Sequence, residues 1–299
     1  MRQSGVSRTE IGWSRVRWVV ALAAVAALAS CSAVKLSYEK ADWLLAQWAQ
    51  RYVDLSAEQE RALRNELADL RRWHRDQELP LYAQAFEDAA VQLEAGMTRA
   101  QIQSVLGTVR ARARILGTHA GQSVAPLLAS LSADQVREME ARFAADNRRF
   151  EKRHLSGDPS DRIERRSAWL VNQLEDWFGK LDPAQRARVD RLVEGFPDMP
   201  ALRLAERKRR QTLVLEAARE GRAGGPAAAR LTNLMADLER GRPGAVHESM
   251  VRWERAFIDM LVELEESLSP EQRAHGAQRL RRYAADFREL AARQTPGAV

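Results

Sequence analysis

The stretch Leu268-Ser269-Pro270-Glu271-Gln272 contains the signal that decides the fold of this chain. A serine followed three residues later by glutamine forms a capping box. The serine oxygen accepts a first-turn N–H, and the glutamine side chain reaches back to the N–H of the serine. Proline directly after the cap is tolerated, because that N–H has no intrahelical partner. The stretch therefore predicts a helix that begins at residue 270.

The same signature, an apolar residue followed by Ser, Thr or Asp, two further residues and Gln, occurs five times in the 299 residues. The segments after these starts repeat apolar residues at intervals of three and four, as in helices that bury one face. No long alternating run of β-branched residues predicts a strand. We therefore expect an all-α fold, an elongated multi-helix bundle. The other four signatures begin at Leu55, Met97, Leu131 and Leu181.

Glycine and proline mark the breaks between these helices. The run Gly157-Asp158-Pro159 predicts an end to the preceding helix, so a subdivision of the chain near 156–160 is one option. The short connections favour a single assembly instead. Pro80 lies inside the helical stretch 73–95 and should kink or split it. Further helices are expected around 200–220, 226–240 and 243–267.

The N-terminal region has the pattern of a leader. Arginines are followed by an apolar run from Trp18 to Ala29, which is too short for a membrane span. The run ends in Leu28-Ala29-Ser30-Cys31, which resembles the bacterial lipobox. This resemblance implies that residues 1–30 are a lipoprotein signal peptide and that Cys31, the only cysteine, becomes an N-terminus carrying acyl chains such as palmitate. An ordinary signal peptide with an unrelated cysteine and an uncleaved anchor are the alternatives.

The remaining residues, 31–299, are expected to form a helical periplasmic domain. Ser32 rather than Asp follows Cys31, which by analogy with enterobacterial sorting favours a lipid anchor at the periplasmic face of the outer membrane. The whole chain has a formal net charge of +6. The leader holds four arginines and one acid, so the mature chain carries 43 basic and 40 acidic side chains, a net charge of +3. This small excess gives no argument for nucleic acid as a partner.

Signatures of catalysis are missing from the sequence. No two of the five histidines lie three or four residues apart, so no metal site is predicted. The sequence also lacks a phosphate-binding glycine loop and a nucleophile elbow, and no thiol remains after acylation. We therefore expect no metal, no cofactor and no enzymatic activity.

Aromatic and polar side chains gather after the leader and suggest a binding surface. In one interpretation the rings pack the base of the bundle, with their polar atoms at its rim. In the other they form a groove for a peptide or a lipid headgroup, with His74, Arg75 and Glu78 at its lip. The candidate residues are Tyr38, Trp43, Trp48, Tyr52, Trp73, His74, Arg75, Glu78 and Tyr82.

Three stretches together resemble a family of uncharacterised proteobacterial lipoproteins. They are the lipobox, the segment from Tyr38 to Ser56, and Trp73-His74-Arg75 with the following Glu78-Leu79-Pro80 and Tyr82. The resemblance implies a helical lipoprotein domain of unknown function and brings no catalytic residues. Separately, the Leu-Ser/Thr-x-x-Gln signature is similar to a motif of small helical stress chaperones of the periplasm.

These observations favour a non-enzymatic envelope lipoprotein. It would bind a protein partner or an envelope component at the periplasmic face of the outer membrane. A membrane-tethered periplasmic chaperone is the alternative, and an enzyme acting on envelope polymers is a third hypothesis. Basic clusters at 148–153, 162–166, 207–210 and 281–282 alternate with acids, which suits either salt-bridged solvated faces or a patch for anionic headgroups. The sequence does not name the partner or the oligomeric state.

We expect Cys31→Ala to yield an unacylated protein that is mis-sorted or remains an uncleaved precursor. One acyl chain gives only marginal membrane binding, whereas a diacylglyceryl group with an amide-linked chain anchors stably. Mass spectrometry of the N-terminus and membrane fractionation measure both effects. A Cys31→Ala protein that is processed and membrane-bound like the wild type would contradict the lipobox.

Overall fold

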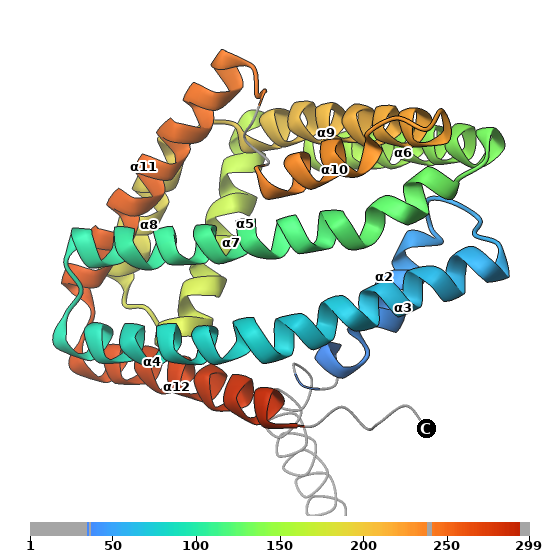
Figure 1. The fold of residues 1–299 in the computed structure, drawn as a ribbon. Helices are drawn as coiled ribbons and strands as arrows, with labels where there is room; N and C mark the ends of the chain where they lie inside the picture. Colours follow the sequence, from blue (N-terminus) through green and yellow to red (C-terminus); the bar gives the residue numbers. More distant parts are fainter. Residues whose placement is uncertain (1–34, 36, 238–240, 294–299) are drawn as a thin grey trace, which may run out of the picture. The chain divides into compact units, whose positions relative to one another are not determined.

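The computed structural model describes residue 35 and residues 37–237 and 241–293 (Figure 1). The expected signal peptide 1–30 and Cys31 lie outside these residues. Of the described residues, 86% are helical and none lies in a strand, which confirms the predicted all-α multi-helix bundle. No helix in this described part combines the length and the apolar character that a membrane span requires.

The helices carry the labels of Figure 1, and the three helices expected between 200 and 267 are found as α9, α10 and α11. A single π-helical turn, η1, separates α3 from α4. The bounds are α2 Ala41–Ala49, α3 Ala57–Trp73, η1 His74–Glu78, α4 Leu79–Ala95, α5 Arg99–Ser130, α6 Ala133–His154, α7 Pro159–Phe178, α8 Pro183–Glu194, α9 Met199–Arg222, α10 Ala227–Ala236, α11 Gly244–Ser267 and α12 Pro270–Ala292.

All five capping boxes predicted from the sequence are present. In each one the cap side chain accepts from the N–H of the glutamine, and the glutamine Oε1 accepts from the N–H of the cap. Pro183 and Pro270 are the first residues of α8 and α12, as expected from their missing N–H groups. The caps are Ser56, Thr98, Ser132, Asp182 and Ser269.

Four of the five glutamines also bind one another in two pairs, which the sequence did not predict. Gln185 Nε2 donates to Gln272 Oε1 at 2.9 Å, and Gln272 Nε2 donates back to Gln185 Oε1 at 3.0 Å. Gln185 Nε2 also donates to Ser267 O at 2.8 Å, and Gln272 Nε2 to Lys180 O at 3.0 Å. Both N–H bonds and both acceptor positions of each amide are therefore used.

The second pair repeats this arrangement at the starts of α3 and α6. Gln59 and Gln135 exchange hydrogen bonds of 3.2 and 2.8 Å. Each also donates to a carbonyl two residues before the other helix's cap, Gln59 to Ser130 O at 3.0 Å and Gln135 to Asp54 O at 2.7 Å. Each pair thus joins two helix N-termini that are distant in sequence.

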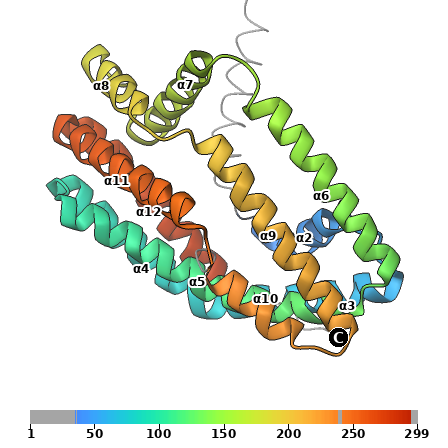
Figure 2. The same cartoon turned by 90° about the horizontal axis from the view of Figure 1, so that it is seen from above.

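The apolar side chains form two hydrophobic cores within residues 42–293. The first core combines α2, α3, the end of α5, α6, α9 and α10. The second combines the end of α4 with α7, α8, α11 and α12. The chain therefore contributes α4 to the second core between α3 and α5, passes to the second core again between α6 and α7, near 156–160, and returns to the first core for α9 and α10 (Figure 2). Contacts group the described residues from Asp42 onward as one compact unit, separate from the residues before it.

Two glycines let α10 approach α5 at backbone distance. A Cβ atom at Gly117 would lie 2.0 Å from Met235 O, and one at Gly121 would lie 2.7 Å from Thr232 Cα. Any side chain at these positions would collide with the backbone of α10. The glycine spacing of four residues places both on one face of α5, and α10 lies across this face (Figure 2).

We expect Gln185→Ala to lower the free energy of unfolding by about 2–3 kcal/mol, because it removes a capping box and leaves the amide of Gln272 without its buried partner. Gln101→Ala is the matched control. It removes a capping box that makes no glutamine pair in the described structure and should cost about 1 kcal/mol or less. Urea denaturation measures both, and equal losses would contradict a stabilising role for the pair.

Candidate functional site

Apart from Tyr38 and Tyr52, the candidate residues from the sequence lie in two neighbouring places within residues 42–293. One is α2, and the other is the junction of α3, η1 and α4. Asp42 at the start of α2 accepts from Arg71 near the end of α3 at 3.4 Å, so the two places adjoin. Tyr38 belongs to the separate N-terminal unit.

Helix α2 exposes nearly all of its large apolar side chains. Trp43 is 48% exposed, Leu44 44%, Leu45 46% and Trp48 54%, whereas Ala46 is fully buried in the first core. A helix in a water-soluble protein usually turns its large apolar residues inward and its small or polar residues outward. In α2 the small residue faces the core and the large residues face outward.

Side-chain contacts hold the end of α2 in place. The ring of Trp48 packs edge-on against Tyr52, with ring centroids 5.0 Å apart, and Tyr52 packs against Phe143 of α6. Arg142 of α6 donates to Gln50 O at 2.8 Å and to Asp54 Oδ1 at 2.9 Å. The exposed face of α2 is therefore presented from a fixed position on the first core.

The second place contains the π-helical turn that Pro80 imposes. Because proline cannot donate a hydrogen bond, Pro80 leaves the carbonyl four residues earlier without its helical donor. Leu79 N–H instead donates to His74 O, five residues back, and closes the π turn. The expected interruption at Pro80 is confirmed, and its form is an extra residue in one turn.

The π turn places Arg75 and Glu78 inside the protein rather than at the lip of a groove. Arg75 is 5% exposed and Glu78 is 3% exposed. Arg75 Nη1 donates to Arg293 O at 3.2 Å, and Glu78 Oε1 accepts from Arg112 of α5 at 3.4 Å. Both were expected at the lip of a groove, but Glu78 instead faces α5, and Arg75 faces Arg293 at the end of α12.

The rings around this turn pack against other helices. Trp73 stacks on His119 of α5 with centroids 3.6 Å apart, and Tyr82 lies edge-on to Phe287 of α12. His74 packs edge-on against Tyr82 at 5.2 Å. Burial lowers the pKa of His74, and burial together with the charge of Glu78 raises the pKa of Tyr82. These rings correspond to the interpretation in which they pack the bundle.

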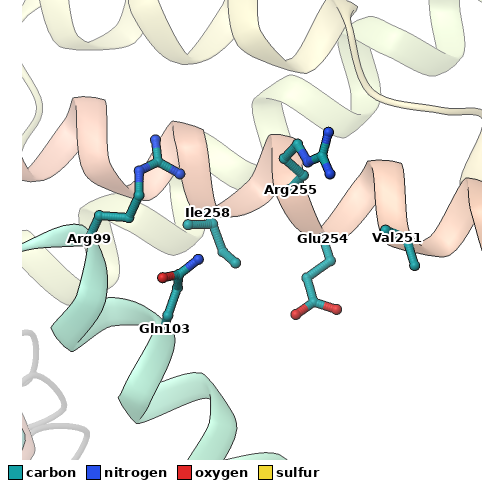
Figure 3. A pocket seen from close by; sticks show the side chains of 6 residues that line it. All are labelled: Arg99, Gln103, Val251, Glu254, Arg255 and Ile258. Atoms are coloured by element: carbon teal, nitrogen blue, oxygen red, sulfur yellow. The ribbon is translucent and has the colours of Figure 1, made fainter.

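A shallow groove between α5 and α11 was not found by sequence reasoning (Figure 3). It consists of two adjoining depressions of about 210 and 340 Å³ that share Val251 and Glu254. Arg99 at its rim pairs with Asp259 at 2.6 Å, and Arg110 pairs with Glu254. No motif marks the groove, because its two sides, α5 and α11, are more than a hundred positions apart in the sequence.

Ion pairs account for much of the basic clusters in the described part. Lys208 Nζ lies 2.8 Å from Glu151 Oε1, and both Arg209 and Arg210 bind Glu206. Salt-bridged helix faces therefore describe these clusters better than a free cationic patch. Within residues 35–293 as described, no group of His, Cys, Asp and Glu side chains is arranged to hold a metal ion.

The fold and its surface thus define an all-α protein with an exposed aromatic helix and no metal cluster in its described part. Residues 51–241 match the family of unknown function DUF6279, and the chain belongs to this family. The match covers Tyr52 and the whole of η1 and begins just after α2. No curated protein and no solved structure matches the chain.

We expect the stability of the protein to fall between pH 7 and pH 5.5, in part because of His74. Its folded-state pKa is below the unfolded value of 6.5, so acid protonates the unfolded state preferentially. His74→Gln should therefore lose less stability over this interval than the wild type. His275→Gln, a substitution of an exposed histidine, is the control. Denaturant titrations at both pH values measure the effect, and parallel losses in all three proteins would refute it.

Proposed function

We propose that this protein is a non-enzymatic lipoprotein of the bacterial envelope. Acyl chains on Cys31 anchor it at the periplasmic face of the outer membrane. It binds a protein partner or an envelope component close to that membrane. The basis for the anchor is the lipobox-like Leu28-Ala29-Ser30-Cys31, and the basis for binding is the surface that follows it in the chain.

The observation that carries the binding proposal is the exposed face of α2. Four large apolar side chains within six residues are 44–54% exposed. Contiguous apolar surface on a soluble domain marks interaction sites, whereas isolated exposed apolar residues are common. The remaining large exposed apolar residues of the described part are dispersed over α4, α5, α7 and α11.

The fixed attachment of α2 suits binding of one defined component. The ion pair of Asp42 with Arg71 holds its start, and the hydrogen bond from Arg142 to Gln50 O holds its end. A surface that is ordered before binding loses little conformational entropy on association. General chaperones instead need an adaptable surface that accepts many unfolded segments.

A membrane-tethered chaperone is the second candidate, because α2 also offers aromatic surface to unfolded chains. The Leu-Ser/Thr-x-x-Gln signature adds little support to this candidate. Its glutamines serve the helix caps, and four of them also pair with one another. The structural role is sufficient to explain the signature.

We expect the chain from residue 32 onward to leave the aggregation of a thermally unfolded client enzyme unchanged at equimolar ratio. Light scattering measures the aggregation. The chaperone candidate predicts the opposite: suppression that Trp48→Ala abolishes and that Trp169→Ala keeps. Trp169 is 61% exposed on α7 and so provides a matched control.

A further inference from the structure

We infer that the exposed face of α2 lies in the interfacial layer of the phospholipid bilayer that holds the lipid anchor. The occupant of this face is the membrane surface itself, not a second protein. The inference rests on the proposed acylation of Cys31 and names the envelope component that α2 contacts. The face consists of Trp43, Leu44, Leu45 and Trp48.

The four side chains share one broad face of the helix, in which Gln47 lies between Trp43 and Leu44. Successive residues of an α-helix are about 100° apart, so Leu44 and Trp48 differ by only about 40°. Trp43 and Leu45 lie on either side of this pair. Ala46 is fully buried on the side that faces the first core. A helix with a broad apolar face and one side attached to a protein body fits a membrane surface, where such helices lie in the interface plane.

The covalent path from the anchor keeps α2 near the bilayer. Six residue steps from Cys31 to Ser37 extend at most about 21 Å. The seven further steps to Leu44 add at most about 25 Å. The bilayer is therefore within reach of α2 in every copy of the anchored protein. A short tether of this kind gives the surface a high effective concentration of lipid.

The chemistry of the segment also suits an interface. Tryptophan rings are enriched where hydrocarbon meets headgroups, because they combine an apolar body with one N–H donor. Lys40 precedes α2 and Arg51 follows it, and both are exposed. Cationic side chains at this depth attract lipid phosphates. Asp42, the one acid within α2, is paired with Arg71, which reduces its repulsion from anionic lipid.

Other apolar surface in the described part does not meet these conditions. Val109 and Val251 lie at the groove between α5 and α11, far along the chain from Cys31. Val91 and Leu81 lie ten positions apart on α4. Among the described residues, only α2 combines several adjacent large apolar side chains with a short path to the expected anchor.

Site-directed spin labelling of the full-length acylated protein tests the inference. The thiol of Cys31 is blocked by acylation, so Leu44→Cys and Leu45→Cys each supply one reactive thiol. Val91→Cys and Val109→Cys are matched controls, since both residues are 57% exposed on other helices. The proteins are placed in protein-free vesicles of phosphatidylethanolamine and phosphatidylglycerol. The rate at which the spin label collides with apolar oxygen is then compared with its rate of collision with a water-soluble nickel chelate, which gives the ratio of oxygen to chelate accessibility.

The inference predicts a several-fold higher ratio of oxygen to chelate accessibility at positions 44 and 45 than at positions 91 and 109. Equal ratios in a protein that still floats with the vesicles would overturn the inference and leave the proposed lipid anchor intact. Protection of positions 44 and 45 only in native envelope vesicles would assign α2 to a protein partner and also overturn it. If Cys31 itself takes up the label and the chain does not float, the acylation proposal fails, and the bilayer assignment fails with it.

Discussion

The reciprocal glutamine pair is the interaction that joins helix starts far apart in the sequence. Each amide joins two helix starts, because its oxygen serves its own cap and its nitrogen serves the other helix. Losing the partner would leave polar atoms of a buried or half-buried amide unsatisfied, which costs more than a hydrogen bond gains. The pairs Gln59–Gln135 and Gln185–Gln272 therefore fix which helix starts meet, while the apolar side chains of the two cores pack the helices together.

Local features of this fold could be predicted from the sequence, whereas long-range ones could not. The caps and the break at Pro80 depend on residues within one helical turn, so a single sequence contains the full signal. The glutamine pairs join positions 76 and 87 residues apart, and no local rule selects the partner. The burial of Arg75 and Glu78 was missed for a related reason, since it depends on contacts with Arg293 and Arg112, which lie 218 and 34 residues away in the sequence.

The candidate surface could likewise be predicted only in part from the sequence. Apolar spacing in α2 resembles that of any core helix, so the sequence indicates aromatic surface without saying which rings remain exposed. The structure shows which of these aromatic rings are exposed. Trp43 and Trp48 face outward, whereas Trp73 stacks on His119 within the bundle. Exposure depends on what the neighbouring helices cover, which is a property of the tertiary arrangement.

The return of α9 and α10 to the first core has a consequence for folding as the chain is exported. A chain with the proposed leader crosses the inner membrane N-terminus first, so α2 to α6, with both residues of the Gln59–Gln135 pair, arrive before α9. Their apolar face stays uncovered until Leu215, Leu231 and Leu234 arrive. By then α7 and α8 are also present, and their apolar face stays exposed until α11 and α12 follow. The two cores therefore form in an interleaved order. Neither the N-terminal nor the C-terminal half of the chain can bury its whole apolar face before the other half is present.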